Sequence, residues 1–405
     1  MTPSSSPRIP GTPFLHAPGP TRLPAQVVNA MGTQPLELGD PALDTLIADC
    51  EAGLRRVFGA RRADVFLYAA NGHGAWEATL CNLVAPGGCV VVAGSGTFSQ
   101  AWALHAEGLG VRVLRTAFED GCAADPAAVG QLLRADTARD IAAVLVVHTD
   151  TGSGVTSDMQ AFRDAIDAAG HPALLVVDVV ASLAAAPFDM DALRVDVAIG
   201  ASQKALMVPP GLCFVAVNEK ALRVAERNTA PRVYWDWLRR KSELSYRKFC
   251  GTPPQSLLMG LQAALGLVFE EGLDHVIARH RRLAAAVQAA VEGWSEGGDL
   301  RFHVRDPASR SVSVTTIAVR AGIDPEALRT LARERFQVGI AGGLGQLAGQ
   351  IFRIGHLGDL NAPMVLGCLG GLEAALSASG IAYGPGVERA VRVLSAPILV
   401  EEAAR

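Results

Sequence analysis

Lys204 is the first candidate for chemistry, because it is the only cation in the segment 195–211, VDVAIGASQKALMVPPG. The segment begins like a buried strand and continues through small and apolar residues, where a charged lysine is costly unless its charge is used or removed. Burial lowers the pKa of an amine, and a neutral amine is the nucleophile that forms a Schiff base with an aldehyde. Lys204 is therefore a candidate nucleophile.

Asp178 is the second candidate, because it ends the apolar run ALLVVD at 173–178. An acid at the end of one strand, followed by a lysine after the next, suggests the chemistry of pyridoxal phosphate (PLP). The lysine would hold the cofactor aldehyde, and the acid would keep the pyridine nitrogen protonated. A surface lysine and a helix cap explain the same two residues, so the pair alone leaves both interpretations open.

The composition of the chain excludes several classes of protein. Hydrophobic residues make up 50% of the 405 positions and charged residues 19%, which predicts a globular protein with one large and one small domain. The formal charge is −4, with both signs mixed along the chain, which argues against nucleic-acid or membrane-surface partners. No apolar run approaches the roughly 18 residues that a membrane span needs.

The cysteines and histidines predict no metal site. The seven cysteines form no C-x-x-C motif, and the nine histidines show no ligand spacing. Free thiols suit a reducing compartment, and the Ser/Pro-rich N-terminus has no apolar segment typical of a secretory signal. We expect a cytoplasmic protein.

Alternating strands and helices must position the two candidate residues. Apolar runs predict strands at 65–68, 89–93, 111–114, 141–147, from Leu174, from Val195 and at 212–217. Helical spacing predicts helices at 41–58, 75–83, 98–107, 126–134 and 158–169. Continuous apolar strands are typical of a mostly parallel sheet that helices cover on both faces.

The second half of the chain predicts a smaller domain. Long helices at 256–272 and 273–291 lead into strands at 311–319 and around 352–356, with helices at 325–336, 363–378 and 387–394. We expect an N-terminal arm (1–25), a large domain (26–272) and a small C-terminal α/β domain (273–405). The basic, aromatic segment 228–252 fits either a loop that faces a partner or the site, or an amphipathic surface helix.

Four turns at the ends of the predicted strands carry unusual residues. They are NGHG at 71–74, HTDTGSG at 148–154, the turn after Asp178, and Ser202-Gln203-Lys204. In an open α/β sheet the ligand lies beyond the carboxyl ends of the strands, and a glycine turn before a helix favours a phosphate. Each turn alone also fits an ordinary loop, but four from one sheet favour a shared site.

The order of these motifs resembles the class V aminotransferases of fold type I, and within them the alanine/serine–glyoxylate aminotransferase group. The similar pieces span Ala17 to Gly358 and are PGPT, NGHGAWE, GTFSQ, HTDTGSG, VVDVVAS, GASQKALMVPPGL, GTPP and FRIGHLG. The resemblance implies the α/β fold of fold type I PLP-dependent transferases, with PLP as cofactor. It also implies a homodimer with its active sites at the subunit interface.

The resemblance assigns a role to each candidate residue around the cofactor ring. It implies that Lys204 forms the Schiff base and that Asp178 binds the pyridine nitrogen. Val180 and Phe98 would cover the two faces of the ring, and Thr151 would bond on the side of its phenolic oxygen.

Other positions resemble the phosphate and substrate sites of the family. The phosphate would be bound by Asn71, Gly72, His73 and Gln203, with Thr252 reaching it from the second subunit. Arg353 would bind the substrate α-carboxylate through its two-pronged guanidinium, and Gly19 would contact the substrate through its backbone.

Two positions depart from the group. Phe249 replaces a tyrosine that contacts the phosphate, and Leu38-Gly39 replaces a His-Arg pair near the substrate. The second change, with HTDTGSG, is similar to the pyridoxamine–pyruvate aminotransferases. The turn NGHG argues against that branch, because it keeps phosphate-binding features that a phosphate-free substrate would not require.

The predicted function is transfer of an amino group from a small amino acid of the alanine or serine type to a 2-oxo acid, glyoxylate or pyruvate. The alternatives are a pyridoxamine–pyruvate-type aminotransferase and a PLP-dependent carbon–sulfur lyase of the same fold. A PLP-fold protein that only binds is disfavoured by Lys204, Asp178 and Arg353 together. An apolar wall at Leu38 favours monocarboxylate donors, unless the basic run 239–241 supplies a second cation.

Overall fold

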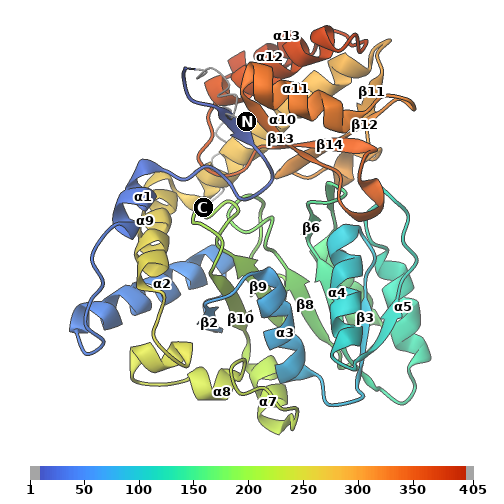
Figure 1. Ribbon diagram of the computed structural model, residues 1–405. Helices are drawn as coiled ribbons and strands as arrows, with labels where there is room; N and C mark the ends of the chain where they lie inside the picture. Colours follow the sequence, from blue (N-terminus) through green and yellow to red (C-terminus); the bar gives the residue numbers. More distant parts are fainter. Residues whose placement is uncertain (1–9, 398–405) are drawn as a thin grey trace, which may run out of the picture.

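The computed structural model describes residues 10–397 and shows a large domain below a smaller one (Figure 1). Residues 1–9 of the predicted arm and 398–405 of the predicted small domain lie outside the described residues. No single helix within 10–397 is long and apolar enough to cross a membrane. One pair, α9 (Gln255–Glu271) and α10 (Leu273–Ser295), passes that test together but is bent by 84°.

The large domain is built on a seven-stranded sheet in the order β2-β10-β9-β8-β5-β3-β4. Its strands are β2 (Asp64–Tyr68), β3 (Cys89–Val92), β4 (Arg112–Arg115), β5 (Ile141–Val147), β8 (Leu174–Asp178), β9 (Val197–Ala201) and β10 (Cys213–Val217). Within this sheet β10 runs antiparallel to β2 and β9, and the other pairs are parallel. The prediction of a mostly parallel sheet is confirmed.

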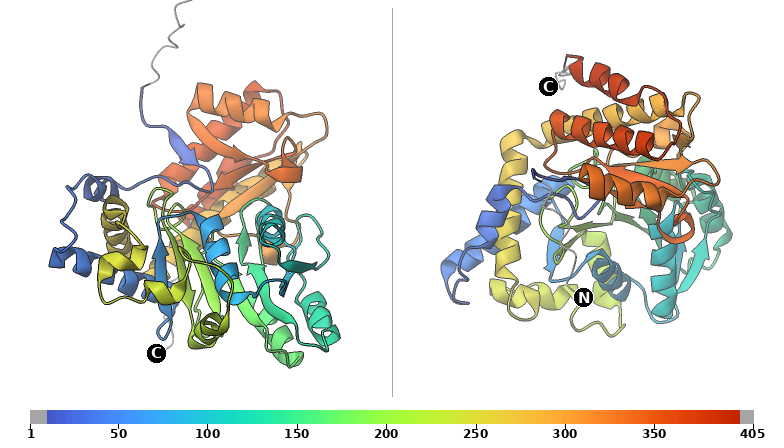
Figure 2. Two further views of the ribbon diagram at one scale, coloured as in Figure 1. Left: turned by 60° about the horizontal axis from the view of Figure 1, so that its bottom comes forward. Right: turned by 45° about the horizontal axis from the view of Figure 1, so that its top comes forward.

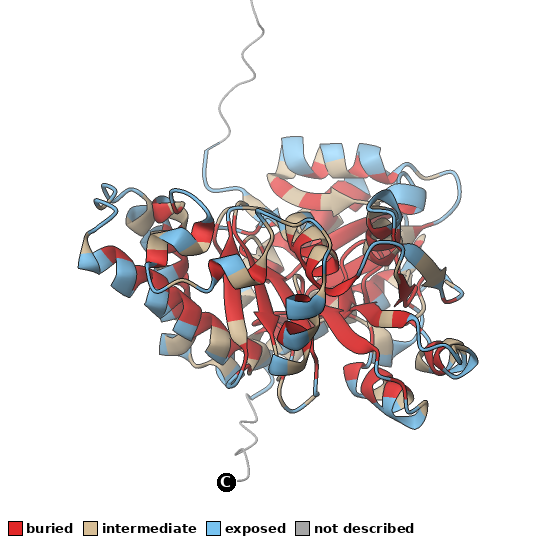
Figure 3. Ribbon diagram, turned by 90° about the horizontal axis from the view of Figure 1, so that it is seen from below, coloured by how far each residue is buried: buried red, intermediate tan, exposed pale blue. Residues whose placement is uncertain are grey.

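Helices cover both faces of this sheet, as continuous apolar strands require. One face carries α2 (Pro41–Phe58), α5 (Pro126–Ala135), α6 (Met159–Ala168) and α9; the other carries α3 (Gly72–Leu83), α4 (Thr97–Gly108) and α7 (Glu219–Arg227). Successive residues of β8 belong to opposite faces, since Leu175 and Val177 pack with the first group while Leu174 and Val176 pack with the second. The strands are therefore buried and the outer helix surfaces exposed (Figure 3).

The small domain is a five-stranded sheet in the order β1-β13-β14-β12-β11. Its strands are β1 (Phe14–His16), β11 (Leu300–Phe302), β12 (Val314–Val319), β13 (Val338–Gly342) and β14 (Ile351–Gly355), and its helices are α10, α11 (Pro325–Phe336), α12 (Ala362–Ala378) and α13 (Gly386–Ser395). The strand β1 pairs in parallel with β13, so part of the predicted arm belongs to this sheet (Figure 2). Helix α1 (Ala25–Met31) follows and packs on α9.

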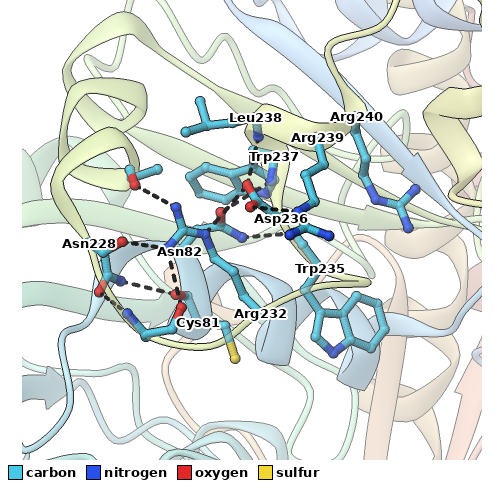
Figure 4. A network of polar contacts seen from close by, with 12 residues as sticks. Cys81, Asn82, Asn228, Arg232, Trp235, Asp236, Trp237, Leu238, Arg239 and Arg240 are labelled. Carbon is cyan, nitrogen blue, oxygen red and sulfur yellow. Dashed lines mark hydrogen bonds and ion pairs between the residues drawn. The ribbon is translucent and has the colours of Figure 1, made fainter.

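The basic, aromatic segment 228–252 is not one amphipathic surface helix, and two of its aromatic side chains pack on the large domain; that it faces a partner stays a prediction. It contains the one-turn helix α8 (Trp237–Arg240) and a short 3-10 helix at Ser245–Phe249. Trp237 is fully buried, and its backbone N–H donates to Asn82 Oδ1 at 3.2 Å (Figure 4). The segment is thus anchored to the large domain through its aromatic side chains.

Each cation of the run 239–241 has a partner within the chain. Arg240 is buried, donates to the carbonyl oxygens of Leu67 and Tyr234, and lies 3.9 Å over the ring of Tyr68. Arg239 lies 3.7 Å from Asp236, and Lys241 lies 2.7 Å from Asp64. The structure therefore leaves no unpaired cation in this run.

Two buried histidines fix the turn after β14, one by joining it to α10 and the other by joining it to β12. His280 Nε2 accepts a hydrogen bond from Gly358 N at 2.9 Å, and His356 Nε2 lies 3.0 Å from Thr315 Oγ1. Burial lowers the pKa of His280 to about 4 and that of His356 to about 3. His280 accepts a hydrogen bond at Nε2, and His356 has a hydroxyl partner at Nε2. Together with burial, these contacts favour the neutral form of each imidazole.

We expect these histidines to make the protein less stable in acid. The unfolded chain takes up a proton on each ring near pH 6.5 and the folded chain does not, so stability is full above about pH 6.5 and falls as the pH decreases. His280→Gln should reduce the difference in unfolding free energy between pH 7.5 and pH 5 by about 2 kcal/mol. The measurement is denaturant unfolding followed by circular dichroism. His275→Gln, at an exposed position on the same helix, is the control, and an equal reduction in both variants would contradict the prediction.

Candidate active site

A cavity of about 320 Å³ opens at the carboxyl ends of β5, β8 and β9. It brings together most of the residues that the sequence predicted, namely Gly19, Asn71, Gly72, His73, Phe98, Thr151, Asp178, Val180, Gln203 and Lys204. Its lining also includes residues to which the sequence analysis gave no individual role, namely Pro20, Trp76, Val147, Thr149, Ala181 and Pro210. Arg353 and Thr252 do not line it.

Lys204 follows β9 and is nearly buried, with 9% of its surface exposed. Its Nζ donates a hydrogen bond to the carbonyl oxygen of Pro18. Burial first, and the charge of Arg353 second, lower the pKa of Lys204 to about 8. An amine with this pKa is neutral in about a tenth of molecules at pH 7, far more than an ordinary lysine, and the neutral form is the nucleophile.

Gly19 leaves the space in which the Lys204 side chain lies. Its φ is +115°, a conformation that other residues rarely adopt. A Cβ built at this position would lie 2.7 Å from Lys204 Nζ. The glycine is thus required both by its backbone conformation and by the close approach of the lysine.

Asp178 ends β8 with both carboxylate oxygens hydrogen-bonded. Oδ1 accepts from Val180 N at 2.8 Å, and Oδ2 accepts from Trp76 Nε1 at 2.7 Å. Burial raises the pKa of Asp178 to about 6, while the two hydrogen bonds act in the opposite direction. The carboxyl group is therefore ionised in most molecules at neutral pH. Trp76 was missed because a tryptophan on a helix is ordinarily a core residue.

The N-terminus of α3 forms the polar end of the cavity. Asn71 caps the helix by accepting a hydrogen bond from Gly74 N at 3.3 Å. The N–H groups of Gly72 and His73 have no acceptor within residues 10–397, as expected for the first turn of a helix. Partial desolvation first, and His105 second, lower the pKa of the half-exposed His73, which favours a neutral ring at this end. These donors can bind an anion such as a phosphate.

Asp150, in the two-residue strand β6 (Thr149–Asp150), holds Phe98 at the cavity. Its carboxylate accepts from Phe98 N at 2.7 Å and from Gly152 N at 2.8 Å. The acid thus joins the loop after β5 to the N-terminus of α4. Burial raises the pKa of Asp150, whereas the four backbone donors around it favour the charged form.

Arg353 reaches the same loop from β14 of the small domain. Its Nη1 donates to Thr151 O and its Nε to Gly342 O, each at 2.6 Å. Burial lowers its pKa to about 10, so it stays charged at neutral pH. Its Nη2 has no acceptor among the described residues, which leaves this nitrogen able to bind a carboxylate beside Thr151.

Four positions that the sequence analysis singled out lie away from the cavity of their own chain. Thr252 is exposed, and Phe249 is buried in the core of the large domain. Leu38 and Gly39 belong to an exposed loop, in which Gly39 N donates to Glu37. The assignments of Thr252 and Leu38 therefore depend on a second subunit. Within residues 10–397, no group of three or more His, Cys, Asp or Glu side chains could hold a metal ion.

Comparison with known proteins assigns the chain to a family. Residues 14–352 match the model of the class V aminotransferases. Two relatives are a serine–glyoxylate aminotransferase from Methylorubrum extorquens, 41% identical and covering 94% of both chains, and an L-aspartate–glyoxylate aminotransferase from Paracoccus denitrificans, 36% identical and covering 93% of this chain and 94% of that protein.

The fold agrees with that family. The crystal structure of a pyridoxamine–pyruvate aminotransferase from Mesorhizobium loti superimposes with a TM-score of 0.85 at 27% identity, covering 96% of this chain and 99% of that one. The resemblance inferred from the motifs is confirmed, as is the fold. The chain belongs to the class V aminotransferases and is an enzyme that moves an amino group between an amino acid and a 2-oxo acid.

Proposed function

We propose that the enzyme uses PLP to transfer the amino group of a small monocarboxylic amino acid, of the alanine or serine type, to glyoxylate or pyruvate. The observation that supports this most directly is the convergence of Lys204, Asp178 and the open N-terminus of α3 on one cavity. These are an amine of lowered pKa, a buried carboxylate and an anion site, which match the aldehyde, the pyridine nitrogen and the phosphate of PLP.

The residues around the cavity fit this cofactor. Phe98 and Val180 offer apolar surfaces for the two faces of a flat ring, and the free N–H groups of Gly72 and His73 suit its phosphate. When bound, PLP supplies an aldehyde for Lys204 and a ring that accepts the electrons released at the substrate Cα. Gln203 lines the cavity beside Lys204 and adds a polar group.

We assign the proton transfer to Lys204. With the cofactor bound, the amine of Lys204 would take the Cα proton of the substrate as general base and return it as general acid. Its pKa of about 8 lies close to neutral pH, and a general acid or base is most effective when its pKa is near the pH of the solution. Asp178 would accept the hydrogen bond of the ring nitrogen, and Arg353 Nη2 would hold the substrate carboxylate and so align the reacting Cα bond.

The small number of cationic side chains at the cavity favours a monocarboxylate donor. Lys204 is the only lysine or arginine among the described residues that line the cavity, and Arg353 behind Thr151 serves one carboxylate. Burying a second, unpaired carboxylate costs on the order of several kcal/mol. The names of the relatives include both serine and aspartate as donors, so the donor has to be measured.

The donor test is a panel of amino acids at fixed glyoxylate. The visible absorption band of the bound cofactor should disappear with the correct donor and return when the correct 2-oxo acid is added. Alanine or serine should exceed aspartate in kcat/KM. An aspartate value about ten times that of alanine, roughly 1.4 kcal/mol, would contradict the proposal.

Replacing the two accessible cations of the run 239–241 provides the matching structural test. Arg239→Ala with Lys241→Ala leaves the buried Arg240 in place, so the fold is retained. Because both cations are paired with acids of their own chain, we expect the kcat/KM of alanine and of aspartate to stay within about twofold, below 0.5 kcal/mol. A selective loss with aspartate would show that this run supplies the second cation.

One alternative function has support from the structure. The similarity to a pyridoxamine–pyruvate aminotransferase, with Leu38-Gly39, favours pyridoxamine as the amino donor. The free N–H groups at the start of α3 favour a phosphorylated cofactor instead. Incubation with pyridoxamine and pyruvate, with alanine as the product measured, separates the two.

We also propose a cytoplasmic homodimer. The position of Thr252, exposed and away from its own cavity, supports a contribution to the cavity of a second subunit. All seven cysteines are free thiols, which suits a reducing compartment. Sedimentation of the purified protein tests the dimer.

A further inference from the structure

Trp76 is a buried ring next to Asp178 and packs between a second tryptophan and a histidine. It is 1% exposed and sits in the first turns of α3. Its ring stacks on Trp102 of α4, with centroids 5.4 Å apart and planes 12° apart, and the ring of His73 lies 4.4 Å away. Its indole N–H donates to Asp178 Oδ2 at 2.7 Å.

The two stacked tryptophans differ in what their N–H groups do. Trp102 is fully buried, and its Nε1 has no hydrogen-bond partner within residues 10–397. Trp76 contributes a similar buried ring, but its N–H reaches the carboxylate of Asp178. Packing explains why both rings are buried, but it does not explain why the N–H of Trp76 points at the carboxylate of Asp178.

The hydrogen bond also completes the support of the Asp178 carboxylate. Val180 N holds Oδ1 and Trp76 Nε1 holds Oδ2, so donors on both oxygens restrain the plane of the group. Each oxygen can accept a further hydrogen bond. A hydrogen bond to the ionised carboxylate favours that form against the burial that disfavours it.

We propose that Trp76 is a positioning residue for the reaction. Its indole N–H keeps Asp178 ionised and oriented toward the ring nitrogen of the cofactor. This inference rests on the proposed function of Asp178, and it adds a residue that acts on the cofactor through Asp178 rather than by its own chemistry.

The experiment compares Trp76→Phe with Trp102→Phe, which removes a buried indole N–H from the stacked partner without removing a hydrogen bond. For Trp76→Phe we expect kcat at pH 7 to fall by about tenfold, the value of one charge-assisted hydrogen bond, with little change in KM. The acidic limb of the pH profile should move to higher pH, and the loss should shrink above about pH 8.5, because the pKa of Asp178 rises when the donor is lost. Trp102→Phe should show neither effect.

A binding readout separates this role from activity. The dissociation constant of PLP for the apoprotein should rise in Trp76→Phe, more at pH 6.5 than at pH 8.5, and change little in Trp102→Phe. In an Asp178→Asn background, Trp76→Phe should have no further effect beyond about twofold, because coupled residues are not additive. Equal losses in the two tryptophan variants, or independent effects of Trp76 and Asp178, would overturn the inference.

If Trp76→Phe does not fold, an unnatural amino acid with the shape of tryptophan but without its N–H provides the same test. Placing β-(3-benzothienyl)alanine at position 76 replaces the N–H by sulfur and keeps the shape of the ring, so the same shift of the acidic limb is expected. An unshifted limb with the isostere would overturn the inference. The roles of Asp178 and Trp76 can fail separately: if Asp178→Asn changes neither the rate nor PLP binding, the proposed function of Asp178 fails. If only Trp76 has no effect, this inference alone fails.

Discussion

Replacing Lys204 with alanine is expected to abolish transamination while the fold is kept. The loss should be at least 10²- to 10⁴-fold, about the contribution of a positioned general base, and larger because the attachment point of the cofactor is also lost. The side chain makes one hydrogen bond, to Pro18 O, and its removal also removes a buried charge that is costly to keep. Circular dichroism should therefore match that of the wild type.

The covalent link to PLP supplies the direct measurement. Reduction of the PLP-loaded protein with borohydride, followed by peptide mapping, should place the label on Lys204. Lys241→Ala, at a lysine whose ammonium pairs with Asp64 outside the cavity, is the matched control and should be labelled like the wild type. A label on any other lysine would refute the assignment.

Local signals made parts of the fold predictable. The helix α2 was predicted with the bounds that the structure has, because every local feature agrees. Asp40 accepts from Ala42 N as N-cap, Pro41 opens the helix, and Gly59 ends it with φ of 61°. The strands β5 and β8 were equally clear, since both are uninterrupted apolar runs.

Long-range pairing made other parts unpredictable. The strand β1 has three residues and becomes a strand only by pairing with β13, which lies more than 300 positions later in the chain. Its partner reads VGIAG, and the glycines hide the strand pattern. The segment 228–252 has the composition of a surface helix. Its only α-helix, α8, is set by the burial of Trp237 and Arg240 against the large domain, which no local pattern predicts.

The candidate site shows the same division. Lys204 and Asp178 could be identified because each is a lone charge at the end of an apolar strand. The hydrogen bond from Trp76 joins residues 102 positions apart, and no local pattern contains it. Arg353 was expected to face the substrate, and the structure adds that two of its donors hold the backbone at Thr151 and Gly342.

Asp178→Asn is the second variant with a very large expected effect. The rate should fall by several orders of magnitude, because a neutral amide no longer favours the protonated pyridine ring. The amide also has one acceptor oxygen where the carboxylate has two, while Trp76 Nε1 and Val180 N both need an acceptor. One of these donors must face the amide NH₂, which should cost about 1–3 kcal/mol of stability.

Asp196→Asn is the matched control for the loss of a buried carboxylate. Asp196 is also buried in the large domain, accepts from Leu175 N at 2.8 Å and from Asn218 Nδ2 at 2.9 Å, and does not line the cavity. Its replacement should lower the free energy of unfolding by a similar amount. It should change kcat by no more than about threefold, which is less than the roughly 1.4 kcal/mol of activation free energy that corresponds to tenfold. If the kcat of Asp178→Asn stays within about tenfold of the wild-type value, Asp178 has a structural role only. Because stability changes in both variants and the rate in only one, the pair separates the chemistry of Asp178 from the packing of a buried acid.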